Sequence, residues 1–361
     1  MLLQTLTILQ LSVAHPFPML VSDVIACSFD SWYKQFRKFT TKSIIFPLSR
    51  EFVASILADG IFVPGFSSSS PGSGRSSPCT CSGTDNSDSE SSNVNENASP
   101  VEGSAHFSQF QSEIDAAIQT LGGSVFVKLN WTSPKDAAWM LCGNSLKCTS
   151  FTDIYLLLKS SDFAVHDLTA PFALCEDVPV DEVSKQPEGF QPVLVLRRWM
   201  DCHPECEFRC FVKDHKLIAI SQRIYDAYFP SIKQNMEYLI KDLRDFMNKN
   251  VLDQFPIPSY TVDLYYNFAS SHSRVKIVDF NVYGLPTDAL LYSWDELDEL
   301  VTTNTTVLPV FRYQSDPSVR PNMMSQYKVP IDLHDIASGS DPSKFIDFVQ
   351  ACVEEQNQHQ S

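Results

Sequence analysis

The chain has 361 residues, a formal net charge of −16 at pH 7, and 43% hydrophobic and 12% aromatic residues. A chain of this length and composition can bury a full hydrophobic core in one large or two medium domains, which excludes a disordered protein. The acidic balance argues against a protein that binds nucleic acid irrespective of sequence, because phosphate backbones require a basic surface.

The first residues, 1–11, are apolar and similar to a signal peptide. They lack a basic start, contain Gln4 and Gln10, and are too short to span a bilayer. We therefore interpret residues 1–26 as an atypical amino-terminal extension and expect no membrane segment. The 10 cysteines include no paired C-x-x-C spacing, and only Cys202, His203 and Cys206 suggest zinc. Free thiols in a reducing cytoplasm are the simpler account.

Aromatic residues recur at helical intervals from Phe29 to Phe39, an apolar run follows at residues 44–48, and a second helical pattern covers residues 52–57. Residues 66–104 are rich in Ser, Gly, Asn and acidic residues. Such a segment cannot bury enough apolar surface to offset its ordering entropy, so we predict a disordered insert.

Regular elements follow the insert. We predict helices at residues 108–121, 151–160 and 231–250, strands at residues 124–129, 193–199, 207–213, 216–223, 260–265 and 276–281, and another helix from Trp294. This order indicates an α+β fold, in which antiparallel sheets are covered by helices.

The last two strands carry three side chains with oxygen atoms. Asp279 and Asn281 are two residues apart and so share one face of their strand, and a short hairpin would bring Asp263 beside them. Hard oxygen ligands suit Mg²⁺, which fills its remaining positions with water and phosphate oxygens. The trio therefore predicts a nucleotide site; the alternative is ordinary solvated carboxylates at strand ends.

Positive charges also occur on predicted strands. Lys128 ends an apolar run, one of Arg197 and Arg198 must share a face with Val195, and half-buried strands carry Arg209 and Arg223. Each cation alone could be an ordinary strand-end charge that reaches water. Their convergence with the oxygen ligands predicts a phosphate and metal site between sheets.

Several segments, in order, resemble the cell division cycle protein 123 family: residues 124–131, 134–137, 145–148, 159–163, 195–199, 207–212, 220–223 and 278–281. The likeness extends over about residues 27–350. It implies an ATP-grasp fold in which ATP and Mg²⁺ lie between two α+β lobes. The implied divisions are residues 27–65 and 105–195 for the first lobe, 66–104 for the insert, 196–350 for the second lobe and 351–361 for a tail.

The resemblance also implies roles for residues of the first lobe and the connection. Lys128 is similar to the lysine that binds the nucleotide phosphates. The adjoining loop would contribute Asn130, Trp131, Ser133 and Asp136. The hinge that contacts adenine through its backbone would be Arg197, Arg198 and Trp199. Val127 and Lys135 depart from the family pattern of proline and arginine, so any phosphate contact at Lys135 would lack bidentate geometry.

The second lobe would supply the remaining contacts. Glu207 is similar to the acid on the ribose side, and Arg209 and Arg223 are similar to cations on the phosphate side. The Mg²⁺ ligands implied by the resemblance are Asp263, Asp279 and Asn281.

The family acts as an assembly chaperone for eukaryotic translation initiation factor 2, binding its gamma subunit so that the alpha and beta subunits can join. The resemblance implies a cytoplasmic, monomeric chaperone that binds ATP and Mg²⁺ and supports translation initiation and cell-cycle progression. The alternative is an ATP-dependent carboxylate–amine ligase, with Arg209 and Arg223 around the transferring phosphoryl group. Enzymatic activity stays open. A protein that binds no nucleotide is disfavoured, because every predicted Mg²⁺ ligand is present.

Overall fold

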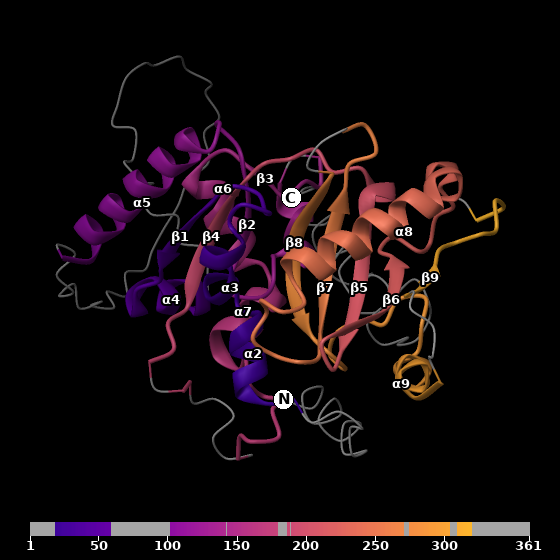
Figure 1. Cartoon of the computed structure of the whole chain (residues 1–361). Helices are drawn as coiled ribbons and strands as arrows, with labels where there is room; N and C mark the ends of the chain where they lie inside the picture. The colour runs from indigo at the N-terminus through magenta and orange to yellow at the C-terminus, as the bar shows by residue number, and fades with distance from the viewer. Residues whose placement is uncertain are drawn as a thin grey trace, which may run out of the picture.

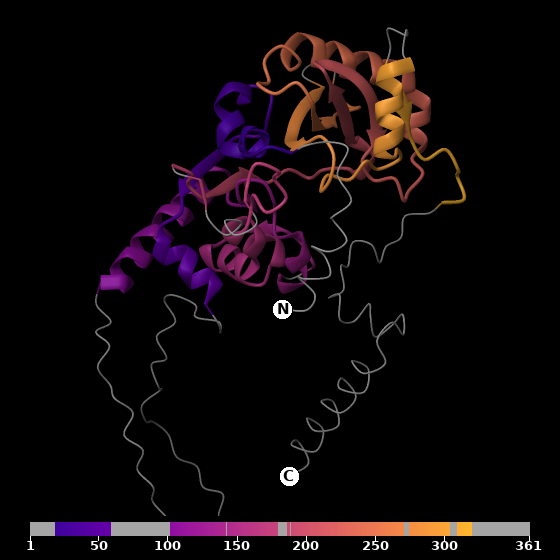
Figure 2. The same ribbon diagram turned by 90° about the horizontal axis from the view of Figure 1, so that it is seen from below.

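The computed structural model describes residues 19–58, 102–141, 143–179, 186–187, 189–270, 274–303 and 309–319. These residues build a four-stranded and a five-stranded sheet with helices packed on them, so the predicted α+β class is confirmed. Figure 1 shows the two sheets side by side, and Figure 2 shows the two lobes from below. Among the described residues, no helix combines the length and apolar character needed to cross a lipid bilayer.

The four-stranded sheet is antiparallel, in the order β1 (Ser43–Pro47), β4 (Val193–Arg198), β2 (Val125–Lys128) and β3 (Lys147–Cys148). Alternate residues such as Val127 and Leu196 point to one face and are fully buried. The helices that cover this face are α4 (Arg50–Leu57), α5 (Glu102–Thr120), α6 (Phe151–Lys159) and α7 (Asp162–Thr169). The other face points toward the second lobe and carries charged residues.

Local signals fix the ends of these helices. The hydroxyl of Ser150 accepts a hydrogen bond from the Asp153 amide, and the Asp153 carboxylate accepts one from the Ser150 amide, which is a capping box at the start of α6. After α5, Gly122 and Gly123 adopt φ values of 105° and 84°. Glycine reaches this region without steric cost, so the helix stops there and β2 begins.

The five-stranded sheet has the order β8 (Val275–Val282), β7 (Tyr260–Tyr266), β5 (Glu207–Lys213), β6 (Lys216–Gln222) and β9 (Val310–Arg312). All pairs are antiparallel except β6 with β9. Helix α8 (Pro230–Asn250) crosses one face, as Figure 1 shows, and buries Leu239, Leu243 and Met247 there. Helix α9 (Trp294–Thr303) covers part of the opposite face, where Leu297 packs with Phe211.

Two amino-terminal helices, α2 (Val21–Cys27) and α3 (Phe29–Phe36), pack against β8. The rings of Trp32 and Phe36 contact Phe280 of β8, with centroid distances of 5.2 and 5.3 Å. Residues 19–26 fell within the segment interpreted as an extension, yet the structure places Met19 and Val24 in the core. These residues therefore belong to the folded protein.

The predicted helices and strands after the insert correspond to α5, α6, α8, α9 and β2, β4, β5, β6, β7 and β8. The predictions missed α2, α7, β3 and β9. Helix α5 begins at Glu102, so residues 102–104 of the predicted insert are helical; Gly103 and Ser104 are poor helix formers and favour a loop prediction. Residues 66–101 of the insert and the whole predicted tail lie outside the described residues.

Candidate functional site

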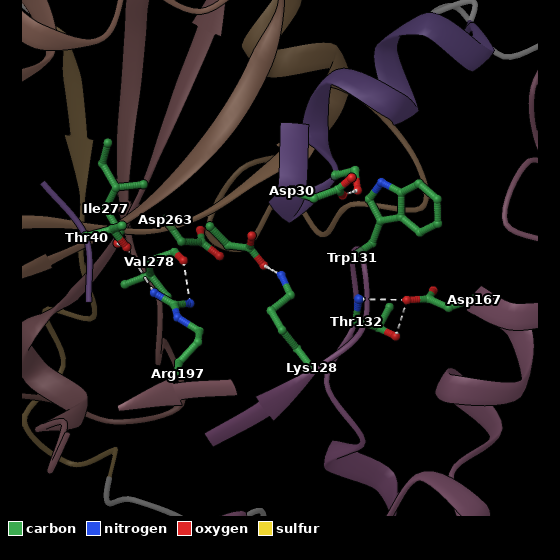
Figure 3. A network of polar contacts seen from close by, with 12 residues as sticks. Asp30, Thr40, Lys128, Trp131, Thr132, Asp167, Arg197, Asp263, Ile277 and Val278 are labelled. Atoms are coloured by element: carbon green, nitrogen blue, oxygen red, sulfur yellow. Dashed lines mark hydrogen bonds and ion pairs between the residues drawn. The ribbon is translucent and has the colours of Figure 1, made fainter. Parts of the chain in front are cut away.

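The inner face of the four-stranded sheet carries two buried cations. Lys128 on β2 lies opposite Val195 of β4, and Arg197 is two residues from Val195. Lys128 and Arg197 are therefore diagonal neighbours on one face, and both reach β8 of the other sheet. Figure 3 shows the two side chains extending from their strands toward the five-stranded sheet.

Lys128 forms an ion pair with Asp279, with 2.5 Å between Nζ and Oδ2. The lysine side chain is 2% exposed and the aspartate side chain 19% exposed. Burial lowers the pKa of Lys128, and the Asp279 charge opposes this shift. The second oxygen of Asp279, Oδ1, is buried and has no hydrogen-bond partner among the described residues.

Asp263 of β7 lies directly opposite Asp279 in the register of the two strands. It is held by a bidentate contact from Arg209, with Nε–Oδ1 at 2.7 Å and Nη2–Oδ2 at 2.8 Å. Arg223 approaches the same carboxylate at 3.5 Å. Burial alone would raise the pKa of Asp263, but the charge and hydrogen bonds of Arg209, aided by Arg223, lower it to about 2.

Asn281 lies opposite Thr261, two register positions beyond the Asp263–Asp279 pair. Asp263, Asp279 and Asn281 therefore share one face, as the alternation predicts. A buried carboxylate oxygen without a partner is uncommon in proteins, and a cation at Asp279 Oδ1 would satisfy it. The oxygen atoms fit Mg²⁺, with Asp279 as the main ligand and Asn281 on the same face of the strand. Both oxygens of Asp263 already accept hydrogen bonds from Arg209, so Asp263 could bind Mg²⁺ only while it keeps that contact.

A cluster of three or more His, Cys, Asp or Glu side chains suited to a metal is absent from the described part of the chain. The Asp263, Asp279 and Asn281 set is of another kind, with two carboxylates and one amide. The segment with Cys202, His203 and Cys206 is fully described, and Cys202 is exposed whereas Cys206 is buried.

Arg197 connects the two sheets through neutral acceptors. Its Nη1 donates to the carbonyl of Val278 at 2.8 Å, and its Nη2 donates to Thr40 Oγ1 at 3.1 Å. The Thr40 hydroxyl in turn donates to the Ile277 carbonyl at 2.7 Å. The register passes from Asp263–Asp279 to Leu264–Ile277, so Val278 is the extra residue of a bulge. The bulge leaves the Val278 carbonyl out of the ladder, where Arg197 can reach it.

Phe29, at the start of α3, lies against both cations. Its ring centroid is 5.4 Å from Lys128 Nζ and 5.2 Å from Arg197 Cζ, and the residue is fully buried. An aromatic ring stabilises cations in such positions through its quadrupole. The sequence showed Phe29 only as the first residue of a helical aromatic pattern, and nothing in that pattern indicated its contact with the two cations.

In the loop after β2, residues that the family resemblance places at the nucleotide form hydrogen bonds to other parts of the protein. Asn130 is buried, and its amide nitrogen donates to Ser28 Oγ at 3.1 Å while its oxygen accepts from the Val193 amide at 2.9 Å. Trp131 Nε1 donates to the Val24 carbonyl at 2.7 Å. Asn130 and Trp131 therefore attach α2 and α3 to the first lobe.

Asp136 and the neighbouring Thr132 also have structural partners. The Asp136 carboxylate accepts from Ser161 Oγ at 2.6 Å and from the Phe163 amide at 3.3 Å, at the start of α7. Asp167 accepts from the amide and hydroxyl of Thr132, both at 2.9 Å, as Figure 3 shows. The loop is thus fixed from two sides.

Ser133, a residue of this loop, is buried, and the exposed Lys135 begins a 3₁₀ helix, η1 (Lys135–Met140). Burial raises the pKa of Glu207 at the start of β5, and the positive charge of Lys135 opposes that shift. Lys135 and Glu207 are therefore electrostatic neighbours of the Asp263 and Arg223 pair.

The predicted adenine hinge has its backbone donors already in use. The Arg198 amide donates to the Lys42 carbonyl at 2.9 Å and the Trp199 amide donates to the Ser124 carbonyl at 3.1 Å. The Arg198 side chain points to the other face, where Nε donates to the Leu121 carbonyl at 3.1 Å. A backbone contact with adenine in this region would use groups other than these two amides.

The structure thus brings Lys128, Arg209, Arg223, Asp263, Asp279 and Asn281 together, with Glu207 beside them. It gives Asn130, Trp131, Asp136 and Arg198 partners within the fold.

Comparison with known proteins identifies the group to which the chain belongs. The model of the D123 family matches residues 32–337. The chain belongs to the D123 family. A relative from Xenopus tropicalis, named translation initiation factor eIF2 assembly protein, is 36% identical over 345 residues, covering 93% of this chain and 98% of the relative. A relative of the same name from Dictyostelium discoideum is 33% identical, with 90% and 94% covered.

A solved structure shows the same fold. C-terminally truncated Cdc123 from Schizosaccharomyces pombe matches with a TM-score of 0.64 and 32% sequence identity. The match covers 83% of this chain and 100% of that one. The family predicted from the sequence motifs is therefore confirmed.

Proposed function

We propose that this D123 family member is a cytoplasmic, monomeric assembly factor for translation initiation factor eIF2, that it has an ATP-grasp fold, and that it binds ATP and Mg²⁺ between its two sheets. The names of relatives that align over nearly the whole chain support the assembly role. We further propose the gamma subunit of eIF2 as its direct partner. Nucleotide would stabilise the arrangement of the lobes that holds this subunit.

The observation that carries the nucleotide proposal is the environment of Asp279. One carboxylate oxygen holds the buried Lys128, and the other is buried without a partner among the described residues. Asp279 and Asn281 would hold Mg²⁺, Lys128 would turn toward the phosphates, and Arg209 and Arg223 would flank them. When bound, Mg²⁺ supplies positive charge that offsets the phosphate oxygens.

Calorimetric titration with Mg²⁺–ATP tests this assignment. The wild type should bind, and Asp279→Asn should weaken binding at least about tenfold, because a neutral amide replaces the anchoring carboxylate. Asp298→Asn is the matched control, since Asp298 also pairs with a lysine, Lys213, but outside the site. Equal affinities of the wild type and Asp279→Asn would reject the metal assignment.

The partner is tested separately. Immobilised protein should retain purified gamma subunit, and adding it to the separate alpha, beta and gamma subunits should increase the yield of heterotrimer. Phosphate release that rises with a carboxylate and an amine, and not with the gamma subunit, would instead establish a ligase. Failure to bind the gamma subunit would reject the assembly role while leaving the nucleotide site intact.

A further inference from the structure

A groove of about 700 Å³ lies on the five-stranded lobe, between the second half of α8, residues 38–40 and the start of β8. None of the predicted nucleotide-site residues lines it. Its apolar lining is Phe39, Phe246 and Val275, and its charged lining includes Lys38, Lys249 and Lys276. Lys38 lies in the turn after α3, Lys249 in α8 and Lys276 in β8, and all three are exposed. The groove is therefore a separate feature of the surface.

The groove has a net positive charge although the chain is strongly acidic. Its two acidic lining residues are each bound by an arginine, Asp242 by Arg274 at 3.0 Å and Asp245 by Arg244 at 3.2 Å. Within the described ranges, no ion pair engages the three lysines. In a chain with a net charge of −16, these uncompensated cations favour an acidic ligand.

The kind of acidic ligand follows from the rest of the lining. The rings of Phe39 and Phe246 meet edge to face at 5.6 Å, and both are partly exposed, so apolar surface lies among the lysines. Lysines are point charges without the fork with which arginine grips a phosphate. Separate point charges around aromatic rings suit carboxylates along a peptide that also carries apolar side chains. We propose that this groove binds an acidic peptide segment of a protein partner, with an apolar side chain of the peptide on Phe39 and Phe246.

Such a peptide would contact residues that connect the lobes. Thr40 lines the groove, and its hydroxyl bonds both Arg197 and the Ile277 carbonyl. The Ile277 amide donates to the carbonyl of Phe39, another groove residue, at 2.8 Å. Occupation of the groove should therefore slow hydrogen exchange of the Ile277 amide, which gives a local readout that does not depend on the nucleotide site.

The test uses a fluorescein-labelled peptide of repeated Glu-Glu-Phe, with Gln-Gln-Phe and Glu-Glu-Ser peptides as matched probes, and full-length protein in fluorescence anisotropy. The combined variant Lys38→Gln, Lys249→Gln and Lys276→Gln should bind Glu-Glu-Phe at least about tenfold more weakly, because three rim charges are lost together. The control variant carries Lys34→Gln, Lys216→Gln and Lys233→Gln, three exposed lysines outside the groove, and should bind like the wild type.

The wild type should prefer Glu-Glu-Phe to both matched peptides, lose affinity as salt is raised, and show slower exchange at Ile277 when the peptide is bound. Equal binding of either matched peptide, equal binding by the groove variant, or unchanged exchange at Ile277 would overturn the proposal. Stronger binding of a single-stranded oligonucleotide than of the peptide would overturn it as well. Because the groove variant keeps Asp279 and Lys128, its Mg²⁺–ATP affinity should be unchanged.

Discussion

Asp263 and Asp279 face each other across β7 and β8, yet their cations come from different sheets. Asp263 is bound by Arg209 of its own sheet, whereas Asp279 is bound by Lys128 of the other sheet. Two neighbouring carboxylates repel unless each has a cation. The contact with Arg209 therefore holds Asp263 within the five-stranded sheet, whereas the ion pair of Asp279 with Lys128 connects the two lobes.

The Lys128–Asp279 contact should show strong energetic coupling. We expect Lys128→Met and Asp279→Asn each to lower the free energy of unfolding by about 2–4 kcal/mol, and the double variant to cost at least about 1 kcal/mol less than their sum, because each single change leaves a buried charge unpaired. Urea unfolding of the four proteins measures this. The same cycle on Lys213 and Asp298, whose side chains are 21% and 32% exposed, should give a coupling under about 1 kcal/mol. Additive costs at Lys128 and Asp279 would contradict the prediction.

Arg197→Lys should loosen the connection between the sheets. Lysine cannot reach the Val278 carbonyl and Thr40 Oγ1 with one planar fork, so we expect a loss of about 1–3 kcal/mol and faster hydrogen exchange at residues 275–278. Arg198→Lys is the control, because Arg198 points to the opposite face and bonds the Leu121 carbonyl. If hydrogen exchange of β8 became faster in Arg198→Lys and not in Arg197→Lys, Arg197 would not be the residue that connects the two sheets.

Phe29→Leu should lower the free energy of unfolding more than Phe36→Leu does. Both phenylalanines are buried in α3, at 0% and 1% exposure, so the packing losses are comparable. Only Phe29 lies against cations, and loss of that interaction should add about 0.5–2 kcal/mol. Thermal and urea unfolding of both variants measure the difference. Equal losses in the free energy of unfolding would show that the ring of Phe29 does not stabilise the two cations.

The contribution of Asp263 should depend on pH. Its pKa is lowered from 3.8 to about 2, so its ionised form stabilises the fold above pH 4, and that stabilisation is lost as the pH falls toward 2. The stability difference between wild type and Asp263→Asn should therefore shrink by about 2 kcal/mol between pH 4.5 and 2. Urea unfolding across that range measures it. A difference that stays constant would show that the Asp263 pKa is not lowered.

Strand alternation was enough to predict that Asp279 and Asn281 share a face, and the predicted hairpin brought Asp263 beside them, as the register shows. The bulge itself was not predictable, since Val278 looks like any other strand residue. Its consequence, a carbonyl open to Arg197, depends on a residue 81 positions away.

In the loop after β2, the sequence did not reveal which partners the polar residues have within the fold. The family resemblance implied that Asn130 and Asp136 belong to the nucleotide site, and within the fold they bond Ser28 and Ser161, which are 102 and 25 residues away. Polar residues near a phosphate-binding lysine have the same pattern whether they face a ligand or support the loop. Helix α2 was missed for a related reason: it is short, and the residues against which it packs lie on β8.

The bridge between Thr40 and Ile277 joins positions 237 residues apart. During synthesis, a ribosome that has passed Arg198 has already supplied every strand of the four-stranded sheet, whereas β8, which carries the partners Asp279, Val278 and Ile277, has still to be translated. For that interval the nascent chain carries two cations on a surface whose anionic and carbonyl counterparts do not yet exist. The contacts between the two lobes can therefore form only late in the synthesis of each molecule.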